Sequence, residues 1–454
     1  LGPRPPPAAR PPSAALTLRV DPRGTRRCRH EARRRGEETA SGRRRAGQRS
    51  GTAGAARPPG QRLGLFGREG PCAGGRLRGG RGSVGAGCLA LDAHHYAAEL
   101  PVPRLNISSP GALATFFERY HNRGPLVIEG ALQEWPALRW TAESLSERCP
   151  SARLPVFAYD LGSADWAALR DAGEMPLGEY LATQFGRDGD GGRRGDALYG
   201  LEMSLRNECP ALLEDLRIPA LFADDMLATY YKKGAWPTLI IGPGGSQSGL
   251  HRDTHDLPFW MAMFRGRKRW RIFLPDDEGL QPLYNEAKNG FSFDPFAPDF
   301  WKYPGLGKVS VYDHVLLPGE LLYIPSGAPH AAYNLEDTIA ISGNYLDGRG
   351  LQRHTEGTCQ QPLWRDSKLC WFYDQEFRRH RPLPLEEVRE LTFFQFYGFS
   401  GPSDWCKAFS TELHDRAEKR PELRRNFPIL DAYCPAEAKG VDSPGADIIN
   451  RWQF

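Results

Sequence analysis

The chain of 454 residues lacks three features that would place it in a special class. It has no C-x-x-C pair among its nine cysteines, no run of about 18 apolar residues, and no internal repeat of fixed period. The cysteine spacing argues against a zinc finger or a disulfide scaffold, so we expect reduced thiols and an intracellular location, in the nucleus or cytoplasm. Without a long apolar run we expect no association with a membrane.

The N-terminal fifth of the chain has no lysine and few large apolar side chains. Residues 1–90 hold 20 arginines and 5 acidic residues, a net charge of +15, so a total of +4 leaves −11 for the remaining residues. We expect residues 1–95 to be a disordered Arg/Gly/Pro-rich tail, because so few apolar side chains cannot offset the entropy lost on ordering. The cluster Arg43–Arg45 predicts nucleic acid as a partner of this tail. The alternative is a mis-assigned start, since the chain begins with Leu and its arginine bias is typical of GC-rich coding.

The remaining chain divides by pattern into three regions. Residues 96–235 form a helical and mixed lead-in region, with a helix, a strand, a capped helix start and a helical stretch predicted at 110–121, 124–130, 140–145 and 211–235. In residues 236–347, short β-branched and aromatic runs broken by Gly and Pro predict an antiparallel sandwich or barrel. Residues 348–454 return to charged helical patterns, for example at 385–391 and 412–419, and we expect a homodimer through these helices.

A histidine and a carboxylate lie two positions apart in one of the strand-like runs. Side chains at such positions share a face of a strand, so His251 and Asp253 are predicted to project together. With one more histidine they make the two-histidine, one-carboxylate set that binds non-haem Fe(II) and leaves positions open for other ligands. His354 and Glu356 have the same spacing, but the segments that surround the first pair are missing around them. We interpret His314 as a structural residue.

Those surrounding segments carry a resemblance to a known family. Gly266-Arg-Lys268 enters a strand, Pro318-Gly-Glu precedes an apolar strand with a tyrosine, and His330 follows. In this order the chain resembles the JmjC (jumonji, cupin-like) Fe(II)/2-oxoglutarate-dependent oxygenases, nearest the protein-hydroxylase branch of lysyl-hydroxylase or phosphatidylserine-receptor type. The resemblance implies a mostly β fold with a double-stranded β-helix (jelly-roll) core over residues 236–347, flanking helices and a helical C-terminal region.

The resemblance also implies roles for seven residues. The iron ligands and catalytic residues would be His251, Asp253 and His330, and the residues that bind 2-oxoglutarate would be Lys268, Ser248, Asn334 and Ser342. A buried dicarboxylate needs a fixed cation, which agrees with Lys268 as the partner of its distal carboxylate. In the hydroxylase branch an Asn takes the place of Met261, so the contact made there must be lost or replaced.

The implied function is an Fe(II)- and 2-oxoglutarate-dependent oxygenase that hydroxylates a protein side chain, or removes an N-methyl group. It would consume O₂ and release succinate and CO₂. One alternative is a tRNA or nucleic-acid base hydroxylase of the same fold, which the negative charge of residues 91–454 opposes. A second alternative is a non-catalytic cupin scaffold that recruits partners through the tail.

Overall fold

The computed structural model describes residues 95–434, apart from residue 164, residues 187–196, 231–236 and 286–289, and most of residues 361–380. The predicted disordered tail lies outside the described residues, except for its last residue.

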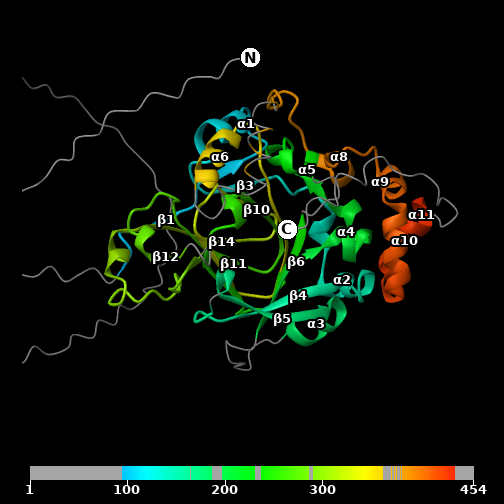
Figure 1. The fold of residues 1–454 in the computed structure, drawn as a ribbon, viewed down its shortest axis with the longest axis horizontal. Helices are drawn as coiled ribbons and strands as arrows, with labels where there is room; N and C mark the ends of the chain where they lie inside the picture. The colour runs from blue at the N-terminus through cyan, green and yellow to red at the C-terminus, as the bar shows by residue number, and fades with distance from the viewer. Residues whose placement is uncertain are drawn as a thin grey trace, which may run out of the picture. The chain divides into compact units, whose positions relative to one another are not determined.

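Two β-sheets form the centre of the fold (Figure 1). The first sheet has the order β1 (Ala98–Pro101), β14 (Ser310–Leu316), β11 (Lys268–Ile272), β16 (His330–Asn334), β9 (Gln247–His251), β13 (Gly290–Phe291) and β12 (Tyr284–Asn285). The second has the order β2 (Arg104–Asn106), β3 (Leu126–Glu129), β15 (Leu321–Ile324), β10 (Phe259–Arg265), β17 (Thr338–Asn344), β8 (Thr238–Gly242), β6 (Leu198–Ser204), β4 (Arg153–Tyr159) and β5 (Leu169–Pro176). Apolar side chains from both sheets meet in one buried cluster. The predicted mostly β fold with a cupin-like core is confirmed.

The lead-in region contributes six of these strands, β1 to β6. β4 pairs with β5 and β6, and β6 pairs with β8, so the second sheet runs across the predicted boundary near residue 236. Among its described residues, up to Tyr230, the stretch 211–235 is helical only in short pieces, two 3-10 turns at Pro210–Asp215 and Ala220–Phe222, and α5 (Met226–Tyr230). Pro219 separates two of these pieces, because proline cannot donate the backbone hydrogen bond that a continuous helix needs.

Short helices pack on the outer face of the second sheet. They are α1 (Ala112–Thr115) with a π-helical turn at Phe116–Tyr120, α2 (Ala142–Arg148), α3 (Leu177–Gln184), α4 (Leu205–Glu208), α8 (Phe393–Phe396), α9 (Pro402–Ala408), α10 (Ser410–Lys419) and α11 (Pro428–Tyr433). The helix α6 (Leu351–Gln360) packs in a separate cluster with Leu257 and Leu346. The predicted capped start is present in α2, where the Thr141 hydroxyl accepts a hydrogen bond from the Ser144 amide at 3.1 Å. Buried residues such as Trp405 and Leu413 join helices and sheet in one core. No helix in the described part of the chain is long and apolar enough to cross a membrane.

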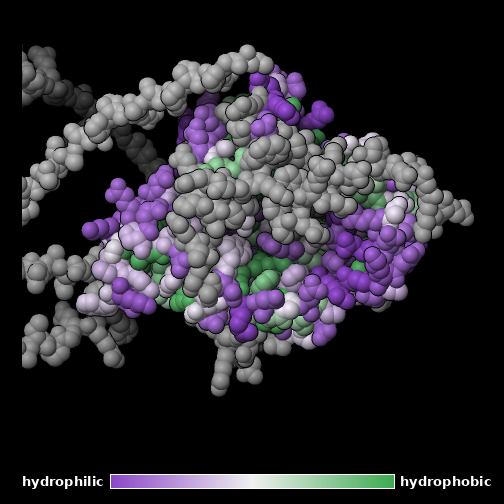
Figure 2. Space-filling model, in the orientation of Figure 1, coloured by the Kyte–Doolittle hydropathy of each residue, from purple (hydrophilic) through white to green (hydrophobic). Residues whose placement is uncertain are grey.

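Within its described residues, the C-terminal region differs from the predicted pattern at 385–391. The helix predicted at 385–391 is wrong, because residues 385–387 form a turn and Leu391–Thr392 forms β18, which pairs with β7 (Arg217–Ile218). Pro382 and Pro384 restrict the chain before this segment, and so short a segment cannot sustain a helix unaided. On the face shown in Figure 2, α10 and α11 are mainly hydrophilic, so this view gives the predicted dimer no support.

Six of the nine cysteines are joined in three disulfide bonds, so the prediction of reduced thiols is wrong. The pairs are Cys149–Cys209, Cys359–Cys370 and Cys406–Cys434. Their sequence separations of 60, 11 and 28 residues gave no pairing signal, and packing of the helical segments brings the Cα atoms to 5.6–5.8 Å. Each bond stabilises the fold by about 2–4 kcal/mol. The nuclear or cytoplasmic location stays a prediction, which these bonds weaken.

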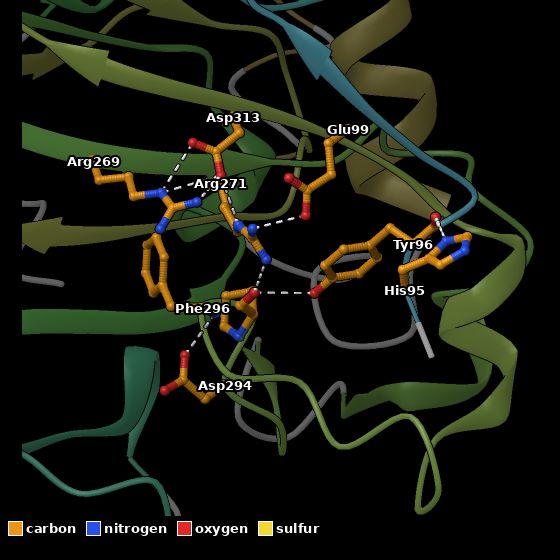
Figure 3. A network of polar contacts seen from close by, with 9 residues as sticks. His95, Tyr96, Glu99, Arg269, Arg271, Asp294, Phe296 and Asp313 are labelled. Atoms are coloured by element: carbon orange, nitrogen blue, oxygen red, sulfur yellow. Dashed lines mark hydrogen bonds and ion pairs between the residues drawn. The ribbon is translucent and has the colours of Figure 1, made fainter. Parts of the chain in front are cut away.

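A polar network fixes the edge of the first sheet (Figure 3). The buried Arg271 donates to Asp313 on β14 at 2.8 Å and to Glu99 on β1 at 2.9 Å. Arg269 also binds Asp313, at 2.6 Å. Burial by itself would raise the pKa of Asp313, but these two arginines lower it below its ordinary value. The network holds β1 against β14 and leaves the opposite face of β11 for the interior of the barrel.

Candidate active site

The three predicted metal ligands come together in the structure. His251 is the last residue of β9 and His330 the first of β16, and they lie opposite each other in the register of the sheet. Asp253 lies just beyond β9 in extended backbone, rather than within the strand as predicted. Its Oδ1 atom is 3.7 Å from the Nε2 atom of each histidine. All three side chains are buried, and their ligand atoms lie within 4.8 Å of one another.

Neighbouring groups orient these ligands for a metal ion. The Nδ1 atom of His251 lies 2.7 Å from the Gly249 carbonyl, and that of His330 lies 2.9 Å from the Ala328 carbonyl. A carbonyl only accepts, so each Nδ1 carries the proton and each Nε2 keeps a free lone pair. Burial lowers the pKa of His330 to about 4, which keeps its imidazole neutral at pH 7. Two imidazoles and a carboxylate are a donor set that fits Fe(II).

One more side chain supports the carboxylate ligand. Asn344, at the end of β17, donates from Nδ2 to Oδ2 of Asp253 at 2.8 Å. That bond leaves Oδ1 facing the two histidines. The sequence reasoning missed Asn344, whose role depends on β17 lying beside the segment after β9.

A bulge in β9 aligns Ser248 with the ligands. The register pairs His330 with His251 and Ala332 with Ser248, so β9 has one extra residue over this interval. In a regular strand Ser248 and His251 would face opposite sides. The bulge lets both line the same cavity.

Lys268 is not itself part of the cavity lining, but it contacts Tyr199, which is. Along β11 the side chains alternate, so Lys268 and Trp270 face the barrel while Arg269 faces out. Lys268 is fully buried, and its Nζ donates to the Tyr199 hydroxyl at 2.6 Å. Burial lowers its pKa to about 7. Gly266 has a φ of +73°, and a Cβ there would meet the Asp337 carbonyl at 2.1 Å, which explains the glycine of the Gly-x-Lys pattern.

The other predicted cofactor residues differ in their placement. Ser342 lines the cavity and lies opposite Met261 on β10, which also lines it. Asn334 lies opposite Lys268 in register, but it is absent from the cavity lining. Its amide is already hydrogen bonded, to Ser246 at 2.8 Å and to Thr338 at 2.9 Å. The structure therefore gives Asn334 contacts that hold the ends of the strands together.

The cavity encloses about 540 Å³ of space, part of it open to solvent. Besides the three ligands and Asn344, its lining includes Tyr199 and Thr238, which the sequence reasoning missed. The Thr238 hydroxyl is buried and has no hydrogen-bond partner among the described residues. A buried cation at Lys268 and an unpaired hydroxyl fit a polar, anionic ligand such as 2-oxoglutarate.

The competing candidates lie elsewhere. His354 is buried on α6, with its Nδ1 atom 3.4 Å from the Ser326 hydroxyl, and Glu356 bonds to Gln352. His314 lies 3.2 Å from Glu320, as expected of a structural residue. Among the described residues, the group able to hold a metal ion is His251, Asp253 and His330.

Comparison with known proteins agrees with this site. The family model described as "Cupin-like domain" matches residues 113–348. The chain belongs to the cupin-like domain family. The matched range includes every predicted site residue. Together with the names of the curated relatives, this match confirms the resemblance to JmjC oxygenases.

Curated relatives carry names from the same group. The chain is 30% identical over 253 residues to "Lysine-specific demethylase JMJ21" of Arabidopsis thaliana, covering 54% of this chain and 25% of that protein. It is 30% identical over 191 residues to "2-oxoglutarate and iron-dependent oxygenase JMJD4" of Gallus gallus, covering 38% and 42%. It is 24% identical over 313 residues to "Bifunctional arginine demethylase and lysyl-hydroxylase psr-1" of Caenorhabditis elegans, covering 63% and 70%. The chain spans 25% to 58% of the length of three Arabidopsis relatives.

Proposed function

We propose that this protein is an Fe(II)- and 2-oxoglutarate-dependent oxygenase that hydroxylates a protein side chain. The reaction consumes O₂ and releases succinate and CO₂. The observation that carries the proposal is the buried convergence of His251, Asp253 and His330 on one point. The names of the relatives, which include an iron-dependent oxygenase, demethylases and a lysyl-hydroxylase, support it.

Different side chains of this protein would bind the iron and the 2-oxoglutarate. His251, Asp253 and His330 would hold the iron, which supplies the redox chemistry that activates O₂. Lys268 and the Tyr199 hydroxyl would bind the distal carboxylate of 2-oxoglutarate. The apolar walls exclude water around that charge and so strengthen the ion pair.

We prefer hydroxylation as the reaction, and N-methyl demethylation is the alternative reaction. Both start with oxygen insertion into a C–H bond, and they differ in whether the product keeps the oxygen or loses a one-carbon fragment. Mass spectrometry of a peptide product separates them directly.

The complete ligand set supports an enzyme over a non-catalytic scaffold. Nucleic-acid binding through the tail and a dimer through the C-terminal helices stay predictions.

The test measures succinate formed from 2-oxoglutarate by the purified full chain with Fe(II) and O₂. The wild type should form succinate, and His251→Ala should lose both iron binding and turnover. His95→Ala removes an exposed histidine remote from these ligands in the fold and serves as the matched control. Absence of turnover in an iron-loaded wild type, with and without peptide, would refute the proposal.

A further inference from the structure

The sequence contains one Asn-x-Ser/Thr triplet, Asn106-Ile107-Ser108, which is the acceptor pattern for an N-linked oligosaccharide. Such a short pattern also occurs by chance in proteins that are never glycosylated, so the triplet alone carries no conclusion. Two properties of the folded protein bear on its use. They are the placement of the Asn106 side chain and the compartment in which the chain folds.

Asn106 lies at the exposed end of an edge strand. It is the last residue of β2, which is the outermost strand of the second sheet and pairs with β3. Its neighbours Leu105 and Ile107 are half-buried and pack against the core, whereas Asn106 between them is exposed. Because side chains alternate along extended backbone, the amide group of Asn106 points away from the core and into solvent.

A tight turn fixes the orientation of this amide group. The backbone N–H of Ser108 donates to Oδ1 of Asn106 at 2.9 Å. A backbone N–H needs an acceptor, so this bond identifies Oδ1 and places Nδ2 on the other arm of the amide. Gly130 has a φ of +79° beside the turn, and a Cβ there would meet Oδ1 at 3.3 Å. Within the described part of the chain no hydrogen bond engages Nδ2, the atom to which a sugar would be joined.

The three disulfide bonds indicate the compartment in which the chain folds. Disulfide bonds form and persist in the secretory pathway and outside the cell, and they are rare where glutathione keeps thiols reduced. N-linked oligosaccharide is a modification of proteins of that same pathway. None of the bonded cysteines lies in β2 or β3, so the disulfide bonds and the exposed triplet are independent observations.

We propose that Asn106 is an N-glycosylation site and that the chain folds in the oxidising lumen of the secretory pathway, rather than in the nucleus or cytoplasm. The donor is an oligosaccharide joined to a lipid through pyrophosphate. Transfer forms a bond between C1 of the first sugar and Nδ2 of Asn106. It breaks the bond between C1 and the pyrophosphate oxygen, and the leaving lipid pyrophosphate takes the proton from Nδ2. No group is oxidised or reduced.

The oligosaccharide would extend from the edge of the second sheet. The lining of the metal-site cavity contains no residue of β2 or β3, so the modification leaves that lining unchanged. The inference therefore goes beyond the proposed function and does not depend on it.

The test maps residue 106 in the full chain purified from the cells that naturally produce it. Peptide N-glycosidase removes the oligosaccharide and converts a glycosylated asparagine to aspartate, which takes up heavy oxygen when the digestion is done in heavy-oxygen water. Mass spectrometry should find this labelled aspartate at position 106, and a non-reducing peptide map should contain the three disulfide-linked pairs. An unmodified Asn106 in most of the chains would overturn the inference, with or without those pairs.

Variants produced in the same cells identify the acceptor. Asn106→Gln and Ser108→Ala should each lose the oligosaccharide and migrate faster in gel electrophoresis, whereas Ser108→Thr, which keeps the hydroxyl, should retain it. Ser109→Ala removes an exposed hydroxyl one position outside the triplet and is the matched control, which should stay glycosylated. An oligosaccharide that persists in Asn106→Gln would also overturn the inference. Succinate formation by the iron-loaded chain tests the proposed function separately, because no variant changes a residue of the cavity lining.

Discussion

Binding of 2-oxoglutarate should depend on pH through Lys268. Burial lowers the pKa of this lysine to about 7, and its hydrogen bond to Tyr199 supplies no opposite charge. A dicarboxylate should bind the protonated form, so binding above pH 7 must include uptake of a proton. At pH 8 about one molecule in ten carries that proton, and at pH 9 about one in a hundred. The apparent Kd should therefore rise about tenfold for each pH unit above 7.

Isothermal titration calorimetry with Mn(II) in place of iron, without O₂, measures this Kd between pH 6 and 9. Buffers with different ionisation enthalpies give the number of protons taken up, which should approach one at pH 8 and above. In Lys268→Arg the guanidinium stays charged throughout, so its Kd should be nearly flat with pH. Lys268→Met should bind about 10-fold to 150-fold more weakly at pH 6, since a hydrogen bond to a charged group is worth about 1.5–3 kcal/mol. A wild-type Kd that stays constant from pH 6 to 9 without proton uptake would refute this reasoning.

The same lysine should affect folding without 2-oxoglutarate. Its pKa is about 7 in the folded chain and 10.5 in an unfolded one, so between these values the unfolded chain binds more protons. The free energy of unfolding should then rise with pH above 7, by up to about 1.4 kcal/mol per unit from this group. Lys268→Met should remove this contribution, which urea denaturation at pH 6.5 and pH 9 measures.

Three further predictions concern other parts of the molecule. Asn344→Leu leaves Asp253 without its amide donor, so Mn(II) affinity in equilibrium dialysis should fall about 10-fold to 100-fold, and an unchanged affinity would exclude the orienting role. Thr238→Val removes a buried hydroxyl with no partner among the described residues, and should raise the free energy of unfolding by about 1 kcal/mol in urea denaturation; a decrease would show that the hydroxyl is bonded. Alkylation of the denatured chain should label six more cysteines after reduction than before, and equal labelling would show that the three disulfide bonds do not form.

Much of the fold followed from local pattern, and the exceptions have a common cause. Most strands of residues 236–347 and the helix α10 were predicted because their own side chains carry the signal, whereas β12, β13 and β14 were not. β5 was not, since most of its residues are exposed, and its strand conformation comes from pairing with β4. The segment 385–391 has helical spacing, yet pairing of Leu391–Thr392 with β7 and two prolines outweigh it.

In the candidate site, too, some residues could be predicted from the sequence and others could not. The ligands could be predicted because their residue types stand in a recognisable order along the chain. Glu202 and Trp166, which also line the cavity, could not, because a bulge in β6 and the close approach of a turn to β9 place them there. Neither feature has a local sequence signature.

The order of residue types along the polypeptide was enough to determine which imidazoles and carboxylate converge and which lysine faces inward. Tertiary structure alone decided which cysteines bond, how far Lys268 loses its hydration, and which other groups line the cavity. The reason is that pairing and desolvation depend on neighbours brought from distant positions. The residue type and its local sequence determine which interactions a residue can form. The neighbours from distant positions determine the free energy of forming them.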